Sequence, residues 1–154
     1  MASIAAVCIS PKKGTVKKEV EQVDLAANWG ISGDAHAGDW HRQVSLLAEE
    51  SIAQVREKLS NLANGAFAEN FIVRGLDFTR VEVGDTLVID NRVRLKITQI
   101  GKECHNHKCA IKRATGDCIM PKEGLFAEVL QGGAVAKGHS IELQKAGGGG
   151  ILNP

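Results

Sequence analysis

The feature that most constrains the fold is a series of short apolar or alternating runs, each interrupted by glycine, aspartate or asparagine. Runs of this length between turn residues are typical of β-strands. In the first hundred residues, one stretch, residues 48–59, has apolar side chains at clear helical spacing, so an alternating βα parallel fold is disfavoured. The chain therefore predicts a mainly β fold (β-rich α+β), namely a closed or half-closed β-barrel with a few helical insertions.

The apolar runs place the expected strands at residues 4–9, 16–23, 43–47, 70–73, 87–89 and 93–100. Asp90-Asn91-Arg92 separates the last two and predicts a hairpin, because Asp and Asn tolerate the positive φ of tight turns. Residues 28–39 are rich in Gly and Asp without periodicity and predict a loop. We expect one domain over residues 1–145 and a flexible glycine-rich tail over residues 146–154.

Composition narrows the classes of partner. The formal net charge of the 154 residues is +1, and aromatic residues make up 4% with no Tyr. Broad capture of nucleic acid or anionic membrane needs a large basic excess, and base stacking needs aromatic side chains. We therefore expect neither partner. The N-terminal apolar run is too short for a signal peptide or a membrane span, which predicts a cytoplasmic protein with reduced cysteines.

The densest chemistry lies in residues 104–118, which hold three of the four cysteines and two of the five histidines, with lysines and an arginine around them. Nearby cations lower the pKa of a thiol and so favour the reactive thiolate. Cys109 has a lysine next to it and another three residues later, and in an extended segment His105, His107 and Cys109 share one face. The alternative is a buried, inert cysteine. Cys8, within an apolar run, is expected to be buried.

Two other uses of this segment stay open. A structural zinc site could use Cys104, Cys109, Cys118 and one histidine, although four residues between the first two cysteines is the wide end of zinc spacing and a second tight pair is missing. A disulfide or resolving pair between Cys109 and Cys118 is the other option. Lys102 and Lys122 are candidates for anion contacts.

A second polar cluster precedes the strand at 43–47 and contains Asp34, His36, Asp39 and His41, followed by Arg42. This spacing suits a proton relay or ligands for a hard metal, and the alternative is a solvated loop whose Asp and Gly residues make turns. An arginine in such a loop can hold a phosphate through two hydrogen bonds.

Four motifs occur in order along the chain. The first is GDAHAG at 33–38 with RQVSLL at 42–47, the second is FAEN at 67–70 with GLD at 75–77, and the third is VGD at 83–85. The fourth is the cysteine segment, with GKECH at 101–105 through Cys109, GDCIMP at 116–121, EGLFAEV at 123–129 and GG at 132–133. Together they resemble the MOSC domain, named for the C-terminal domain of molybdenum cofactor sulfurase, in its small stand-alone bacterial type. The resemblance extends from the first expected strand to Leu143.

The resemblance implies a β-rich, barrel-like fold and a pocket with a reactive cysteine that either ligates molybdenum in the molybdenum cofactor or carries sulfur as a persulfide. Cys109 stands where the family has its cysteine. The residues expected to act in catalysis are Cys109, His36 and Cys118, and those expected to bind the cofactor are Arg42, Lys102, Asn70, Glu69 and His107.

We therefore expect a sulfur carrier or a protein that handles the molybdenum cofactor, with sulfur-transferase or molybdenum-dependent reductase-like activity as the enzymatic forms. Its partners would be the pterin cofactor or a protein that donates or accepts sulfur. The alternatives are a non-catalytic molybdopterin-binding module and a zinc-stapled β domain, in which Cys104 would be a ligand. Pyridoxal phosphate is not expected, because it belongs to the separate desulfurase domain of the large sulfurases.

Overall fold

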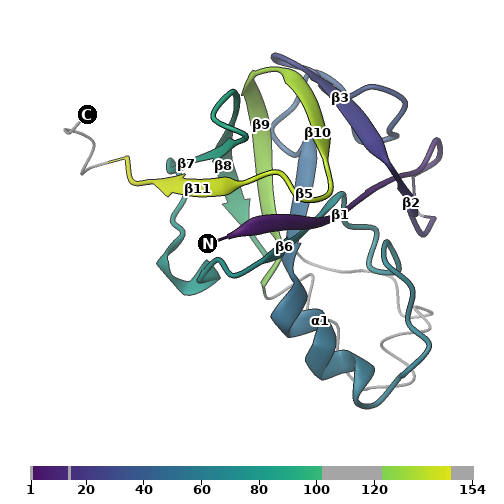
Figure 1. The fold of residues 1–154 in the computed structure, drawn as a ribbon. Coiled ribbons are helices and arrows are strands. Elements are labelled where there is room, and N and C mark those ends of the chain that lie inside the picture. The colour runs from purple at the N-terminus through teal and green to yellow at the C-terminus, as the bar shows by residue number, and fades with distance from the viewer. Residues whose placement is uncertain (1, 14, 102–122, 147–154) are drawn as a thin grey trace.

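The computed structural model describes residues 2–13, 15–101 and 123–146, and its fold is mainly β (Figure 1). The larger sheet has eight strands in the order β11-β7-β8-β9-β5-β6-β1-β2, and the smaller has three in the order β10-β3-β4. The bounds are β1 Ser3–Ile9, β2 Lys18–Val20, β3 Gln22–Ala26, β4 Gly30–Ile31, β5 Val44–Ala48, α1 Glu49–Arg56, β6 Phe71–Arg74, the 3-10 helix Phe78–Arg80, β7 Thr86–Ile89, β8 Val93–Ile100, β9 Leu125–Gln131, β10 Gly133–Ala136 and β11 Ile141–Gln144.

The mainly β prediction is confirmed, but the larger sheet is not closed into a barrel. Its neighbouring strands are antiparallel except for the parallel pair β5–β6. The start of β1 reaches the turn before β11 through one bridge, Ser3–Ser140, and through Ile4 N–H donating to the His139 carbonyl at 2.9 Å. Among the described residues no ladder pairs β2 with β11, so the sheet curls without closing.

The single strand predicted over residues 16–23 is wrong, because this stretch supplies parts of two strands in different sheets. β2 pairs with β1 in the larger sheet, and β3 pairs with β10 in the smaller one. Along β3, Val23 and Leu25 are buried while the residues between and beside them are exposed. This alternation is the period-two pattern of a strand with one buried face. It begins only after the change of direction at Glu21.

The helix and the hairpin appear where the sequence places them, with shorter bounds for the helix. α1 ends at Arg56, three residues before the end of the apolar pattern. Two glutamates in its first turn suit the positive N-terminal end of the helix dipole. In the hairpin between β7 and β8, Asp90 and Asn91 have φ of 55° and 56°, the left-handed conformation that these side chains tolerate.

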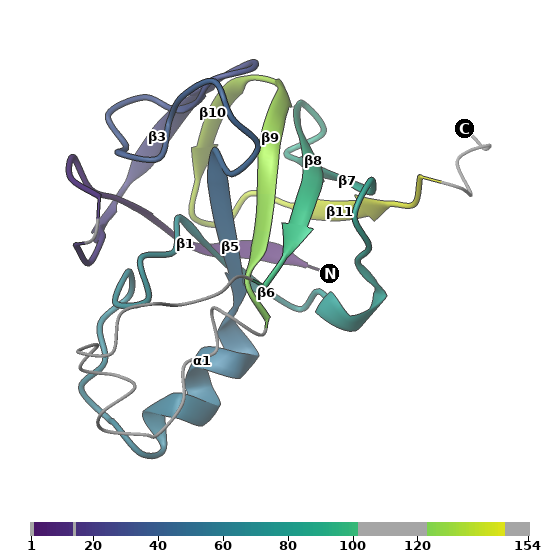
Figure 2. The ribbon, with the colours of Figure 1, turned by 180° about the vertical axis from the view of Figure 1, so that it is seen from behind.

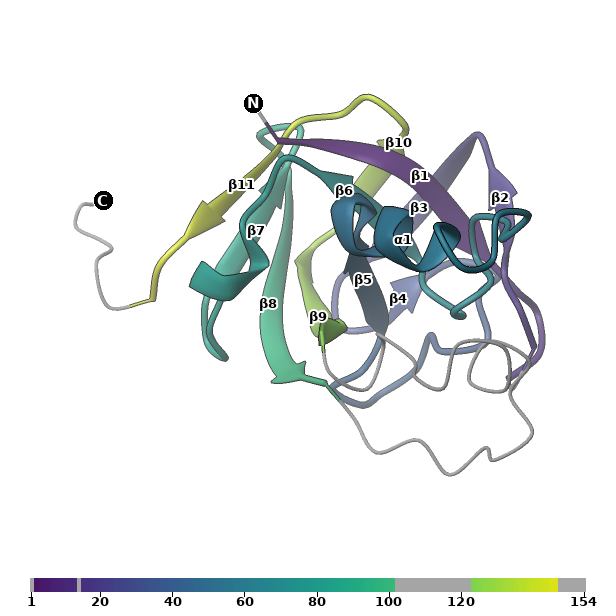
Figure 3. The ribbon, with the colours of Figure 1, turned by 90° about the horizontal axis from the view of Figure 1, so that it is seen from below.

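The core has two parts, on opposite faces of the larger sheet. One lies between the larger and the smaller sheet and includes Phe71, Leu95 and Val135. The other lies beneath α1, where Ile52 packs with Leu47. Figures 1 and 2 show β3 and β10 at one end of the molecule and α1 at the other. Seen from below in Figure 3, α1 crosses β5 and β6.

Cys8 on β1 is fully buried, as predicted. Burial raises the pKa of its thiol to about 12, with the carboxylates of Glu69 and Glu19 adding to the effect. A thiol with this pKa stays protonated and unreactive at neutral pH. In the part of the chain that the structure describes, no helix is long and apolar enough to cross a membrane.

Candidate functional site

A pocket of about 60 Å³ opens beside β5. Four parts of the chain line it: the connection between β4 and β5, strand β5 itself, the residues just before β6, and the beginning of strand β9. The lining residues are His36, Trp40, Arg42, Ser45, Ala68, Asn70 and Phe126. The segments are far apart in sequence and meet because β5 lies between β6 and β9 in the sheet.

Arg42 is the cation of the pocket. Its guanidinium carbon lies 4.8 Å from the ring centre of Trp40 and 5.8 Å from that of Phe126. Its Nε is buried and has no hydrogen-bond partner, and no described residue forms an ion pair with it. A buried donor without a partner costs about 1–3 kcal/mol. An anion in the pocket would remove this cost and neutralise the charge.

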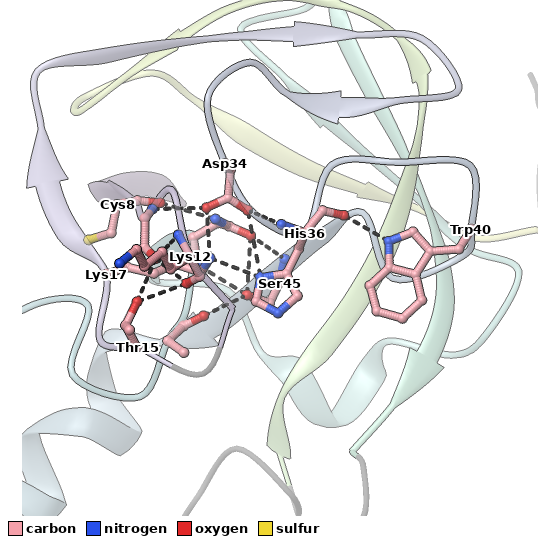
Figure 4. A network of polar contacts seen from close by, with 11 residues as sticks. Cys8, Lys12, Thr15, Lys17, Asp34, His36, Trp40 and Ser45 are labelled. Atoms are coloured by element: carbon pink, nitrogen blue, oxygen red, sulfur yellow. Dashed lines mark hydrogen bonds and ion pairs between the residues drawn. The ribbon is translucent and has the colours of Figure 1, made fainter.

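Behind the pocket lies a buried ion pair. The Lys17 ammonium donates to Asp34 Oδ1 at 2.7 Å, and the two side chains are 1% and 0% exposed (Figure 4). Asp34 also accepts the backbone N–H groups of Ser10 and His36, each at 3.1 Å. Burial alone would raise the pKa of Asp34, but the nearby His36 side chain, the hydrogen bond from Lys17 and the charge of the lysine outweigh burial and hold this pKa well below its usual range.

His36 connects this ion pair to the pocket. Its Nδ1 lies 3.0 Å from Lys17 Nζ, whereas the 3.7 Å from Nδ1 to Asp34 Oδ2 is too long for a hydrogen bond. The Trp40 indole N–H donates to the backbone carbonyl of His36 at 2.7 Å, and the two rings are stacked with 6.3 Å between their centres. The imidazole is therefore held on both sides, by Lys17 and by Trp40.

Asn70 and Ser45 form the polar floor of the pocket, and their side chains bond within the protein. Asn70 Oδ1 accepts the Ser45 N–H at 3.0 Å, and its Nδ2 donates to the Cys8 carbonyl at 3.1 Å. The Ser45 hydroxyl accepts the Asn70 N–H at 3.1 Å. These bonds join β1, β5 and the start of β6, so Asn70 holds the pocket wall together as well as lining it.

Glu69 is fully buried beside the pocket and is not one of the residues that line it. Its two carboxylate oxygens accept the N–H groups of Gly65 and Phe67, each at 2.9 Å. Burial raises the pKa of Glu69, and these two hydrogen bonds oppose that rise. Gly65 has a φ of 90°, and a Cβ there would meet the Lys17 carbonyl oxygen, so only glycine fits. Glu69 thus fixes the 65–69 loop against Lys17.

The structure brings together three of the residues proposed from the sequence: His36, Arg42 and Asn70. Asp39 and His41, from the same polar cluster, do not line the pocket. The remaining proposed residues lie outside the described part of the chain: Lys102, Cys104, His105, His107, Cys109, Cys118 and Lys122. Their roles, the zinc alternative among them, stay predictions.

Sequence reasoning did not propose the lining residues Trp40, Ser45, Ala68 and Phe126, nor Lys17 behind the pocket. Lys17 follows Lys12 and Lys13 and precedes Lys18, so nothing in the sequence marks it as the buried member of the group. Trp40 gave a usable signal, because it is one of two tryptophans in a chain poor in aromatic residues and stands two positions before Arg42.

The described residues on either side of the segment that contains the three remaining cysteines lie next to each other, and one side leads directly into the pocket wall. The segment leaves the described chain after Gly101, which follows β8, and returns at Glu123, just before β9. The Gly101 N–H donates to the Gly124 carbonyl at 2.7 Å, so the two ends meet. Phe126, two residues further on, lines the pocket.

The fold and the pocket define the class of protein first: a small, mainly β domain whose pocket holds an arginine with a buried Nε that has no hydrogen bond to a described residue. The family follows from the sequence itself, because the family model of the MOSC domain matches residues 33–142. The chain belongs to the MOSC domain family. The recognition of this family from the four motifs is confirmed.

Relatives and solved structures agree with this assignment. The uncharacterised protein YflK of Bacillus subtilis (strain 168) is 28% identical over 149 residues, which cover 90% of this chain and 66% of that relative, slightly less than two thirds of its length. The crystal structure of YuaD from Bacillus subtilis has a TM-score of 0.74 at 20% identity and covers 93% of this chain and 96% of its own. That of YiiM from Geobacillus stearothermophilus has a TM-score of 0.70 at 20% identity, with 97% and 78% covered. At this identity the two structures establish the fold.

Proposed function

We propose that this protein handles the molybdenum cofactor or its sulfur, with the pocket binding the anionic end of the ligand and Cys109 acting as the working thiol. Membership of the MOSC family associates the chain with proteins related to molybdenum cofactor sulfurase. The observation that carries the proposal is the Arg42 guanidinium, which lies in a pocket between two aromatic rings without a hydrogen bond to any described residue.

The residues of the pocket fit the phosphate end of a pterin cofactor. A guanidinium matches a phosphate group by charge and by its fork of N–H donors. His36 lies on the same pocket and adds a ring nitrogen. A volume of about 60 Å³ is smaller than the several hundred Å³ that enclose an organic cofactor, so this pocket suits one end of such a ligand.

In this proposal the metal ligand is Cys109, outside the described residues. Across residues 2–13, 15–101 and 123–146, no group of three or more His, Cys, Asp or Glu side chains is arranged to hold a metal ion. A thiolate is the soft ligand that suits molybdenum, and Cys109 would supply it. The described residues that flank the cysteine segment, Gly101 and Gly124, are hydrogen-bonded to each other two residues before Phe126 of the pocket wall, which supports this assignment.

In the sulfur-carrier form of the proposal, the Cys109 thiolate attacks the terminal sulfur of a donor persulfide. A new S–S bond forms at Cys109 while the S–S bond of the donor breaks, and the donor leaves as a thiolate. The transfer is an exchange without net oxidation, so it needs no further oxidant. The lysines on either side of Cys109 favour the attacking thiolate.

Cyanolysis tests this form directly. Protein incubated with a persulfide donor and freed of excess donor should release thiocyanate when treated with cyanide. Cys109→Ala should abolish the release, while the matched variant Cys104→Ala should retain it. Equal release from wild type and Cys109→Ala would end the sulfur-carrier proposal.

The same pocket supports a second candidate, a cofactor-binding module without turnover, because Arg42 can hold a phosphate whether or not a thiol reacts. Protein purified from cells that make the molybdenum cofactor is assayed for pterin and molybdenum. Retention of both in Cys109→Ser but not in Arg42→Gln would favour the binding module. Loss of both in Cys109→Ser would favour a cysteine ligand to molybdenum.

A further inference from the structure

The polar groups that the pocket offers to a ligand can be counted from its hydrogen bonds. The side-chain amide of Asn70 is occupied at both ends, and the Ser45 hydroxyl bonds to Asn70. The indole N–H of Trp40 is taken by the His36 carbonyl. Among the side chains described around the pocket, two polar groups have no hydrogen bond to a described residue: the Arg42 guanidinium, whose Nε is buried, and His36 Nε2.

The guanidinium has hydrogen-bond donors and no acceptor, so His36 decides whether the pocket also offers an acceptor to a ligand. A neutral imidazole has one N–H donor and one acceptor nitrogen, and the partner of one nitrogen decides which of them carries the proton. Figure 4 shows the His36 ring between Lys17 and Asp34 on one side and Trp40 on the other. The nearest partner of Nδ1 is the Lys17 ammonium at 3.0 Å.

An ammonium group has three N–H donors and no acceptor, so Nδ1 facing it must accept. The lysine side chain is 1% exposed and bonded to Asp34 at 2.7 Å, which holds the ammonium in place. A proton on Nδ1 would point at this cation. The remaining proton of the neutral ring therefore belongs on Nε2, the nitrogen that has no bond to a described residue.

We infer that Lys17 is a positioning residue that fixes His36 as the Nε2–H tautomer, so that the pocket presents hydrogen-bond donors alone and selects an acceptor-only dianion such as a phosphate monoester or sulfate. The inference rests on the proposed function and deepens it by naming the class of group that the pocket takes. It also narrows the role of His36, which the sequence analysis assigns to catalysis: His36 donates a hydrogen bond to the ligand and does not act as a base.

The tautomer is measured by NMR on protein with 15N-labelled histidine, because the two ring nitrogens have different chemical shifts when protonated and unprotonated. The signals of His36 are identified by their loss in His36→Gln. The expected result at neutral pH is a protonated Nε2 and an unprotonated Nδ1. A protonated Nδ1 in the wild-type chain would overturn the inference, and this measurement needs no variant at Lys17.

The role of Lys17 is tested by replacing both members of the ion pair, since Lys17→Met alone would leave Asp34 buried and unpaired. In Lys17→Met/Asp34→Asn, Nδ1 loses its donor, so its chemical shift should move and the Nδ1–H tautomer should become populated. A Lys145→Met/Asp85→Asn variant, which removes a lysine–aspartate pair of similar length away from the pocket, is the matched control and should leave His36 unchanged. Identical His36 spectra in the Lys17→Met/Asp34→Asn variant and the wild type would overturn the role of Lys17.

Anion selection is tested by titrating sulfate and methyl phosphate while following His36 Nε2. Either anion should move this signal, and Arg42→Gln should weaken binding by about tenfold or more, as expected for a lost charged hydrogen bond. If methyl phosphate binds more tightly than sulfate, the pocket takes the phosphate end of an organic molecule. If the two anions bind equally tightly, the pocket takes a free oxyanion. No movement with either anion would overturn the donor-only pocket.

These measurements are made in a Cys109→Ala background as well. Sulfur transfer is lost there by design, while the tautomer and the anion affinity should be those of the wild type. Failure of the inference about Lys17 can therefore be told apart from failure of the proposed sulfur chemistry.

Discussion

Two fully buried carboxylates, Asp34 and Glu69, hold the two loops beside the pocket, and their pKa values shift in opposite directions. Burial works against the charge of both. Asp34 faces the Lys17 ammonium at 2.7 Å, and the net result is a pKa well below the usual range. Glu69 accepts two backbone N–H groups, and its pKa stays raised.

The difference shows what a buried negative charge needs. Neutral N–H donors satisfy the oxygens of Glu69 geometrically without cancelling the cost of removing the charge from water, whereas a cation does both for Asp34. The two carboxylates also differ in which residues their contacts reach. The bonds of Glu69 end in its own loop, while the Asp34–Lys17 pair continues to His36 and so into the pocket.

The largest effect should come from breaking the ion pair on one side. Lys17→Met leaves the Asp34 carboxylate buried without its cation, and we expect the free energy of unfolding to fall by about 3–5 kcal/mol. Urea denaturation followed by circular dichroism measures the loss.

The double variant Lys17→Met/Asp34→Asn is the control for that prediction. Removing both charges also removes the cost of burying either, so much of the lost stability should return. A single and a double variant of equal stability would show that the lysine contributes by packing rather than by its charge.

A smaller loss is expected for Glu69→Gln. The amide keeps one acceptor oxygen but turns an NH₂ group toward the N–H of Gly65 or of Phe67, which leaves one buried donor without a partner. The expected cost is about 1–3 kcal/mol, reduced by the relief of burying a charge. Urea denaturation at neutral pH measures it. A cost above that of Lys17→Met would reverse the proposed ranking of the two carboxylates.

The free energy of unfolding should change with pH in opposite directions for Glu69 and for Asp34. A raised folded-state pKa means that folded Glu69 binds its proton first, so its contribution rises as pH falls through that pKa toward the ordinary value of 4.5. Asp34 has a lowered pKa, so its contribution is present above the ordinary value of 3.8 and is lost as pH falls toward the folded-state pKa. Urea midpoints against pH for wild type, Glu69→Gln and Lys17→Met/Asp34→Asn measure both slopes.

In this series, the wild type should gain stability from Glu69 as the pH falls toward 4.5, and Glu69→Gln should not show this gain. Below pH 3.8 the wild type should lose stability as Asp34 becomes protonated, and the double variant should lose less. Parallel curves for all three proteins would show that neither carboxylate changes its proton affinity on folding.

The sequence predicts the mainly β class, the hairpin at Asp90-Asn91 and the burial of Cys8, because each depends on local periodicity or turn chemistry. It also selects His36 and Arg42, which share one short motif. It does not predict Lys17, because the burial of this lysine is decided by the 65–69 loop and by Asp34, both distant in sequence. The sequence predicts a closed or half-closed barrel without choosing between them, since closure depends on whether the last strands meet.

The smallest effect is expected at an exposed ion pair with the same contact distance as the buried one. Arg74 Nε donates to Glu49 Oε1 at 2.7 Å, the distance between Lys17 and Asp34, but these side chains are 57% and 33% exposed. The hydrogen bond to Arg74 is the main cause that lowers the pKa of Glu49, yet water solvates both charges when they separate.

Glu49→Gln should therefore leave the urea midpoint within the scatter of replicate measurements. The matched comparison is Lys17→Met, in which the lost contact is equally long. A loss in Glu49→Gln as large as in Lys17→Met would mean that contact distance, and not burial, sets the strength of ion pairs in this fold. The argument for Lys17 as the residue that orients His36 would then lose its energetic basis.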